Sequence, residues 1–151
     1  MLRTRLNDAL KDSMKAKEAR ATSTLRLILA ALKDRDIAER SKGNGDGLGD
    51  EQILEMLQKM VRQRHDSIEM YTKGQRDDLA KREAEEIEII ERFLPKQMDE
   101  TDMRAAIESV IGELGAASVK DMGRVMSTLK ERYPGRMDFG KASGIVKEAL
   151  V

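Results

Sequence analysis

Apolar residues recur at helical spacing along most of this chain and nowhere at the spacing of a strand. Leu2, Leu6, Leu10 and Met14 are four residues apart, which places them on one face of a first helix that ends near Lys17. No segment alternates apolar and polar residues with a period of two, so we expect no strand. The pattern therefore predicts an all-α fold.

A second helix is predicted between a cap at Thr22 or Ser23 and a last turn at Arg40. Its apolar face carries four aliphatic residues, Leu25, Ile28, Leu29 and Leu32. Residues 41–49 contain four glycines and interrupt the helical pattern, so we expect a mobile loop there.

Two long helices follow, over residues 50–73 and 78–94, and together they predict a helical hairpin. Gly49 is in position to cap the first of them. We expect Gly74 to end that helix in the left-handed conformation. Pro95 ends the second helix, because the residue before a proline avoids the helical region of backbone space.

The composition changes after Met98, and three shorter helices are predicted beyond it. Their starts are marked by residues suited to helix capping, namely Thr101, Ser118 with Asp121, and Asp138. Gly115 closes the first of the three. We therefore divide the chain into an N-terminal helical domain, residues 1–96, and a C-terminal three-helix bundle, residues 97–151.

Composition narrows the classes of function. The 151 residues are 40% hydrophobic and 37% charged, a combination that excludes a disordered chain and favours long exposed helices. The chain has no cysteine, which excludes disulfides, thiolate metal sites and cysteine nucleophiles. Its longest apolar run, residues 27–32, is far too short to span a bilayer, and the N-terminus lacks the apolar core of a signal peptide. We expect a cytoplasmic protein with no membrane partner.

Three segments imitate catalytic motifs without the residues that the chemistry needs. Residues 135–142 have the glycine and lysine spacing of a phosphate-binding loop, but Ala142 stands where that loop needs Ser or Thr for magnesium. His65 is the only histidine and has no second histidine with which to complete a metal site. The glutamates of residues 83–91 stand close to Lys81, Arg82 and Arg92, which is typical of a solvated helix with i,i+4 ion pairs. We therefore predict no catalytic residue, no metal site and no cofactor.

Basic residues are concentrated near the C-terminus, although the whole chain carries no net charge. Between residues 118 and 147, seven Lys or Arg stand against three acids, a net of four positive charges. A local excess of this kind favours contact with the phosphates of a nucleic acid. The candidate RNA-binding residues are Lys120, Arg124, Lys130, Arg132, Arg136, Lys141 and Lys147.

Two further observations qualify this nucleic-acid hypothesis. Aromatic residues are only 3% of the chain, too few for base stacking, so a structured RNA would be recognised by shape and backbone. A second basic cluster lies in residues 1–33, which hold eight Lys or Arg against three acids.

Several segments together resemble the GatB/YqeY-like family, the stand-alone relatives of the tail domain of the B subunit of tRNA-dependent amidotransferase. The resemblance covers nearly the whole chain and rests on residues 23–33, 57–64, 74–80, 83–87, 93–97 and 120–126. One departure is visible, because the family pattern Gly-Arg-Ala-Asp is here Gly-Arg-Met-Asp, with Met137 in the third place. The change keeps both Arg136 and the cap at Asp138.

The resemblance implies an elongated N-terminal helical domain followed by a small three-helix bundle. In the amidotransferase the corresponding tail contacts tRNA, whereas amide transfer and ammonia production belong to other domains. The resemblance also carries a carbon–nitrogen ligase activity with glutamine as the amido-N-donor. This chain has no cysteine, no amidase-type serine–glycine stretch and no kinase-like ATP site, so any such activity would need partner catalytic subunits.

We therefore expect a non-catalytic accessory module that binds tRNA or another structured RNA through the basic face of the C-terminal bundle. The alternative is a protein-interaction adaptor, in which the hairpin of residues 50–73 and 78–94 docks an enzyme of the translation apparatus. A third hypothesis, an amidotransferase that acts alone, lacks a paired acid, base and nucleophile. RNA binding requires the predicted cations to share one face, and their divergence around the bundle would favour the adaptor.

Overall fold

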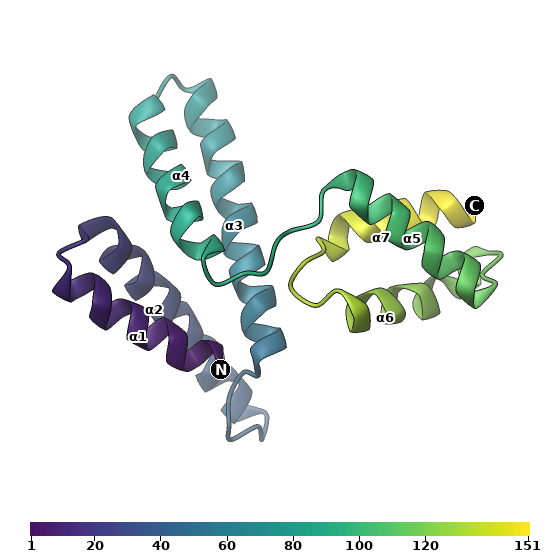
Figure 1. Ribbon diagram of the computed structural model, residues 1–151, viewed down its shortest axis with the longest axis horizontal. Helices are drawn as coiled ribbons and strands as arrows, with labels where there is room; N and C mark the ends of the chain where they lie inside the picture. The colour runs from purple at the N-terminus through teal and green to yellow at the C-terminus, as the bar shows by residue number, and fades with distance from the viewer. The chain divides into compact units, whose positions relative to one another are not determined.

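The computed structural model describes residues 1–151 and consists of helices and the segments that join them, with no strand. The predicted all-α class is therefore confirmed. In chain order the elements are α1 (Leu2–Lys15), α2 (Ala19–Ser41), α3 (Asp50–Lys73), α4 (Asp77–Glu91), α5 (Glu100–Leu114), the 3-10 helix η1 (Val119–Asp121), α6 (Met122–Arg132) and α7 (Phe139–Leu150) (Figure 1). None of these helices combines the length and the apolar character that crossing a membrane requires.

Packing divides the chain into two compact units, Met1–Leu94 and Pro95–Val151. Lys96 belongs to the second unit, where its carbonyl accepts a hydrogen bond from Arg136 Nε at 3.2 Å. Gln97 joins the same unit, since its side-chain amide donates to the carbonyl of Gly135 at 2.6 Å. The first unit thus ends slightly before the limit expected at residue 96.

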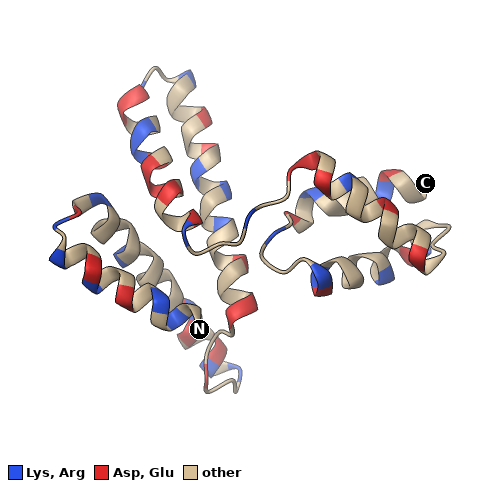
Figure 2. Cartoon of the chain, in the orientation of Figure 1, with Lys and Arg blue, Asp and Glu red and all other residues tan.

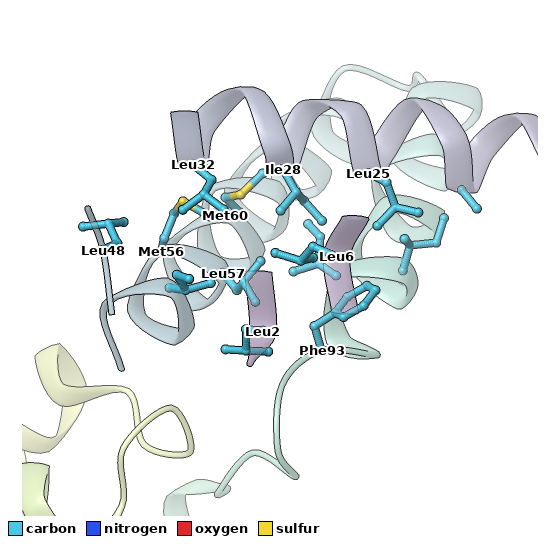
Figure 3. Close-up of a cluster of buried hydrophobic side chains, with 14 residues drawn as sticks. Leu2, Leu6, Leu25, Ile28, Leu32, Leu48, Met56, Leu57, Met60 and Phe93 are labelled. Atoms are coloured by element: carbon cyan, nitrogen blue, oxygen red, sulfur yellow. The ribbon is translucent and has the colours of Figure 1, made fainter. Parts of the chain in front are cut away.

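The first unit packs two helical hairpins, α1–α2 and α3–α4, around one hydrophobic core (Figure 1). Leu6, Ile28 and Leu57 come from three different helices and are fully buried at its centre (Figure 3). Phe93, which follows α4 in the chain, is also a buried member of this core. No residue from 62 to 86 belongs to this core, so the tip of the α3–α4 hairpin extends beyond it.

The start of α3 follows the predicted arrangement. Gly49 is the N-cap, and its backbone N–H donates to Gln52 Oε1 at 3.1 Å. Leu48 and Ile53 flank this cap and are both buried in the core, as in a hydrophobic staple. The predicted cap at Gly49 is confirmed.

The second unit is a bundle of α5, α6 and α7 around its own core. Val110, Leu129 and Val146 each come from a different helix and are fully buried. Met137, the departure from the family pattern, is also fully buried. The larger side chain therefore fills the interior between the three helices, the use to which a flexible methionine is suited.

Some helix caps follow the sequence and others do not. Asp138 caps α7, and Gly115 ends α5 in the left-handed conformation at φ 62°, so both predictions are confirmed. The predicted cap at Thr101 is wrong, because α5 begins one residue after Asp99, whose Oδ1 accepts the N–H of Asp102 at 2.7 Å. Neighbouring residues with similar capping preference compete for one position, and the carboxylate takes it here.

The predicted start of α2 at Thr22 or Ser23 is also wrong, since the helix begins at Ala19. The Ser23 hydroxyl donates to the carbonyl of Arg20, in the preceding turn of the same helix, at 3.1 Å. The Thr22 hydroxyl lies 2.9 Å from that of Ser13 on α1, so neither side chain caps a helix.

The ends of the α3–α4 hairpin differ from the prediction by a few residues. Gly74 has φ −84°, and Gln75, at φ 58°, takes the left-handed conformation instead. The helix α4 ends at Glu91, and a turn carries the chain on to Leu94. The hairpin itself, with two long helices joined by a tight turn, is as expected.

Candidate interaction surfaces

Two of the predicted RNA-binding arginines form ion pairs within the second unit. Arg124 Nη2 donates to Asp121 Oδ1 at 3.1 Å and to the carbonyl of Leu114 at 3.4 Å. Arg132 Nη2 donates to Glu113 Oε2 at 2.5 Å. The Arg124 guanidinium therefore joins α6 to Asp121, just before this helix, and to the last residue of α5. The Arg132 guanidinium joins the end of α6 to α5.

Arg136, a third predicted residue, lies in the turn between α6 and α7. Its Nε donates to the carbonyl of Lys96, and its guanidinium carbon lies 5.9 Å from the centroid of the Tyr133 ring, within range of a cation–π contact. Its own carbonyl accepts the N–H of Met98 at 2.9 Å. Arg136 thus holds the segment before α5 against the bundle.

The remaining four predicted residues are exposed lysines that form no ion pair, Lys120, Lys130, Lys141 and Lys147. Lys141 lines a cavity of about 410 Å³ between the start of α5 and one side of α7. Glu100, Asp138 and Glu148 line the same cavity. A phosphate approaching Lys141 would meet these carboxylates, which disfavours that position as an anion contact.

The predicted cations diverge around the bundle. Lys141 and Lys147 are six residues apart on α7, so their side chains leave the helix about 120° apart. Arg124 and Lys130 have the same separation on α6. The seven residues therefore do not form one continuous basic face.

Lys130 and Lys147 nevertheless both leave their helices on the side that turns away from α5. On α6, Arg132 reaches α5, and Lys130 leaves the helix about 160° from it. On α7, Lys141 lines the cavity beside α5, and Lys147 leaves the helix about 120° from it. Helical rotation thus turns both lysines away from the sides of their helices that face α5.

The basic excess of residues 118–147 is offset within its own unit. Residues 95–151 contain nine Lys or Arg and nine Asp or Glu, and residues 1–94 contain nineteen of each. The balancing acids of the second unit are mainly on α5 and its N-cap, Asp99, Glu100, Asp102, Glu108 and Glu113 (Figure 2). Each unit is neutral, so net charge does not attract a polyanion to either.

The glutamates of α4 pair between helices. Arg64 Nε donates to Glu86 Oε2 at 2.9 Å, with the two side chains 14% and 12% exposed. Arg20 Nε donates to Glu85 Oε2 at 3.1 Å. The interpretation of this run as a solvated helix with i,i+4 pairs is therefore wrong for these two glutamates. In the sequence, Arg64 stands among the apolar residues that mark one side of α3. This position could have indicated that it pairs with a neighbouring helix.

The other two candidate motifs are the segment of residues 135–142 and His65. The Asp138 carboxylate accepts the N–H groups of Gly140 and Lys141 at 3.0 and 3.2 Å. These are the groups that would hold a phosphate in a phosphate-binding loop, so a carboxylate already occupies that place. His65 is exposed, and no cluster of three or more His, Asp and Glu side chains is arranged to hold a metal ion.

A surface missed by the sequence reasoning lies on the outer side of α2. The exposed side chains of Leu27 and Ile37 retain 49% and 52% of their accessible surface. We call this surface the α2 face and define it by Leu27, Ala30, Ala31, Ile37 and Ala38. Its spacing is itself helical and could have been found, but it lies on the same helix as the buried stripe that includes Ile28 and Leu32.

A groove of about 340 Å³ runs beside the α2 face, between α2 and α3. The residues that line it are Ala31, Asp34 and Arg35 from α2 and Met56, Lys59, Met60 and Gln63 from α3. Both methionines belong to the core of the first unit. The groove therefore has an apolar floor, and its edges carry two basic side chains and the carboxylate of Asp34.

Comparison with known proteins identifies relatives across most of the chain. Altered inheritance of mitochondria protein 41, mitochondrial, from Lachancea thermotolerans is 32% identical over 111 residues, which are 72% of this chain and 57% of that protein. The protein of the same name from Candida glabrata is 37% identical over 90 residues, or 59% of this chain and 47% of that one. The one from Clavispora lusitaniae is 32% identical over 145 residues, or 93% and 80%.

The chain spans about half the length of the first two relatives. The names of these relatives place them in mitochondria, whereas the cytoplasmic location expected for this chain stays a prediction. The family described as Yqey-like protein matches residues 3–150. This match covers nearly the whole chain, which confirms the predicted membership: the chain belongs to the YqeY-like family.

Proposed function

We propose that this protein is a non-catalytic adaptor that binds a partner protein through the α2 face. The observation that carries the proposal is the exposure of Leu27 and Ile37 on a helix whose opposite side is already buried. Apolar side chains gathered on an exposed surface are typical of interaction sites, because leaving them in water is unfavourable.

The placement of the charged side chains supports binding over catalysis. Arg64 is paired with Glu86 in the first unit, and Arg132 is paired with Glu113 in the second. Each pair joins two helices of its own unit. The side chains of these pairs stabilise the fold, and none of them is a nucleophile that lies beside a base. These contacts support a scaffold that presents surfaces.

The family resemblance supports an enzyme of the translation apparatus as the partner. The tail domain that the chain resembles is an appendage of an amidotransferase subunit, so a stand-alone relative is expected to act beside a catalytic protein. The α3–α4 hairpin is the weaker docking candidate, because its tip charges pair locally, as in Lys73 with Glu69 and Arg76 with Asp78.

The test is capture of partners by the full chain from nuclease-treated extract of its own cells. The double variant Leu27→Asp/Ile37→Asp removes the apolar surface, and Met70→Asp, at a side chain 74% exposed on the hairpin, is the matched control. We expect one identified protein to be retained by the unmodified chain and by the control, and to be lost with the double variant. Capture that depends on RNA, or an identical set of proteins with all three chains, would overturn the adaptor.

RNA binding is a second candidate, and Lys130 and Lys147 are the observation that favours it. Both lysines are exposed, form no ion pair and lie on the sides of α6 and α7 that turn away from α5. Lysine contacts to phosphate are independent of base sequence and weaken with salt. A salt titration with variants of these two lysines tests this candidate.

A further inference from the structure

The α2 face has the residue spacing of a helix–helix seam. Leu27 and Ala30, followed by Asp34 and Ile37, repeat at alternating intervals of three and four residues. This is the spacing at which one helix presents a continuous row of side chains to another. Apolar residues thus lie on both sides of α2, one row in the core and one exposed row that the carboxylate of Asp34 interrupts.

One flank of this seam carries three basic residues at intervals of seven. Arg26, Lys33 and Arg40 are all exposed, and none forms an ion pair. A separation of seven residues places successive side chains nearly above one another on a helix. They form a row of positive charge beside the apolar seam.

The other flank is the groove between α2 and α3, and it is basic as well. Arg35 and Lys59 line it, are exposed, and form no ion pair. Its floor is made by Met56 and Met60, whose flexible side chains adapt to the shape of a partner. The carboxylate of Asp34, which belongs to the seam, also lines this groove, so on this flank two positive charges stand against one negative charge.

From this arrangement we infer that the α2 face seats an amphipathic helix of a partner protein, with apolar residues on the seam and acidic residues along both flanks. The inference rests on the adaptor function proposed above and specifies its partner. The seam from Leu27 to Ala38 is about 16 Å long, which matches a partner helix of about three turns. The binding mode is a helix laid into a groove, in which charged flanks select the partner and its orientation.

Other occupants fit the surface less well. In an antiparallel pair of two copies, the row of Arg26, Lys33 and Arg40 would face its own counterpart, and like charges in contact are unfavourable. An RNA backbone would satisfy the basic rows but would leave Leu27 and Ile37 against phosphates. An acidic amphipathic helix complements both the apolar residues of the seam and the excess of positive charge on its flanks.

The test uses labelled synthetic peptides and fluorescence anisotropy with the full chain. One helical peptide of about 14 residues carries leucines at seam spacing and glutamates on both flanks; a second carries lysines in place of the glutamates, and a third has the composition of the first in scrambled order. We expect the glutamate peptide to bind at least about tenfold more tightly than the other two. Equal binding of the glutamate and lysine peptides, or no binding of the glutamate peptide, would overturn the inference.

Charge reversal on the protein gives the reciprocal result. The variant Arg26→Glu/Lys33→Glu/Arg40→Glu is expected to prefer the lysine peptide, and this exchange of preference itself shows that the variant is folded. Lys11→Glu/Lys15→Glu/Lys81→Glu carries the same change of charge on exposed positions elsewhere in the first unit and should bind as the unmodified chain does. Loss of binding in the control, or an unchanged preference in the first variant, contradicts the assignment.

Two measurements separate this inference from the adaptor function itself. If sedimentation shows a dimer that Leu27→Asp dissociates, the occupant is a second copy and the assigned partner is wrong. If the captured partner protein is still lost with Leu27→Asp/Ile37→Asp while the peptides fail, the adaptor stands and the acidic helix does not. If no protein is captured and the peptides fail, both proposals fall.

Discussion

Arg3 and Asp36 form a bidentate ion pair that joins the first turn of α1 to the later part of α2. Arg3 Nη2 donates to Asp36 Oδ1 at 3.0 Å, and Nη1 donates to Oδ2. The same carboxylate accepts the backbone N–H of Leu48 at 2.9 Å. One carboxylate with only 9% of its side chain exposed therefore holds two helices and the loop before α3 together.

Replacing Asp36 by Asn should destabilise the protein in a pH-dependent way. The hydrogen bonds from Arg3, and then from the Leu48 N–H, lower the pKa of Asp36 in spite of its burial. The pair therefore stabilises the fold above the pKa of the unfolded chain, about 3.9, and this contribution is lost as the pH falls through the folded-state pKa. We expect Asp36→Asn to lower the free energy of unfolding by about 1–3 kcal/mol at neutral pH. The difference from the unmodified chain should shrink toward low pH.

Urea unfolding in a pH series from about 7 to about 2 measures this effect. The control is Asp34→Asn, at an exposed carboxylate of the same helix, for which we expect a change within about 0.5 kcal/mol. Equal losses in the two variants, or a difference that does not vary with pH, would show that the Arg3 ion pair is not the source of stability.

Gly47 should be the least replaceable glycine of the loop between α2 and α3. Its φ is 77°, and a Cβ added there would lie 2.4 Å from Asp36 Oδ1. Gly43 has φ 96° but no atom within 4 Å of an added Cβ, so it is the matched control for backbone strain alone. Both Gly→Ala variants cost about 1–2 kcal/mol for the left-handed backbone, and Gly47→Ala should cost about 1 kcal/mol more because it displaces the Asp36 carboxylate. Thermal unfolding of the two variants side by side settles the point, and equal melting temperatures would contradict it.

The ion pair between Arg64 and Glu86 should show strong coupling in a double-mutant cycle. Glu86→Leu leaves a mostly buried guanidinium without its carboxylate, which we expect to cost about 1–3 kcal/mol, and Arg64→Met is the other single variant of the cycle. The double variant Arg64→Met/Glu86→Leu replaces both charges by apolar groups and should recover most of that loss. For comparison, Lys73 and Glu69 are 75% and 67% exposed and should couple by less than about 0.5 kcal/mol. Similar coupling energies for the two pairs would mean that burial does not strengthen the first.

The pKa of Glu83, on the α3–α4 hairpin, is shifted in the opposite direction from that of Asp36. Burial, and then the charge of Glu86, raises the pKa of Glu83, while Arg64 opposes the shift. A carboxylate whose folded-state pKa is raised destabilises the fold while it is ionised, and the penalty disappears as the pH falls through that pKa. Glu83→Gln should therefore increase the free energy of unfolding at neutral pH and give no increase at acidic pH. Glu88→Gln, at an exposed position of α4, is the control, and an equal gain there would contradict the assignment.

Local patterns were sufficient to predict most of the helices. On α6, Val125 and Leu129 recur at helical spacing and are fully buried, because a short amphipathic helix packs its single apolar stripe against the core. Asp138 could be predicted as a cap because its carboxylate needs to reach only the N–H groups of the next turn. Such features depend on neighbours within a few residues.

Contacts between helices could not be predicted in the same way. Arg64 and Glu86 are 22 residues apart, and Arg132 and Glu113 are 19 apart, so helix packing decides whether they meet. The density of basic residues after position 118 suggested one surface, but helical rotation separates Lys141 from Lys147. The α2 face escaped notice because one helix carries two apolar rows, and the first already accounts for the core.

Removing Lys130 and Lys147 should reduce the salt dependence of RNA binding if the second candidate function holds. Each lysine that contacts a phosphate contributes about 0.7 to 0.9 to the slope of log Kobs against log salt, so Lys130→Gln/Lys147→Gln should lower the slope by about twice that amount. The matched variant Lys96→Gln/Lys141→Gln loses the same charge where carboxylates line the adjoining cavities, Asp102 in one and Glu100 in the other, and should keep the original slope. Fluorescence anisotropy with a tRNA transcript between about 50 and 200 mM salt measures both. Because phosphate contacts carry no sequence information, an unrelated RNA hairpin should respond in the same way, and identical slopes for the two variants would remove the α6–α7 side as the RNA contact.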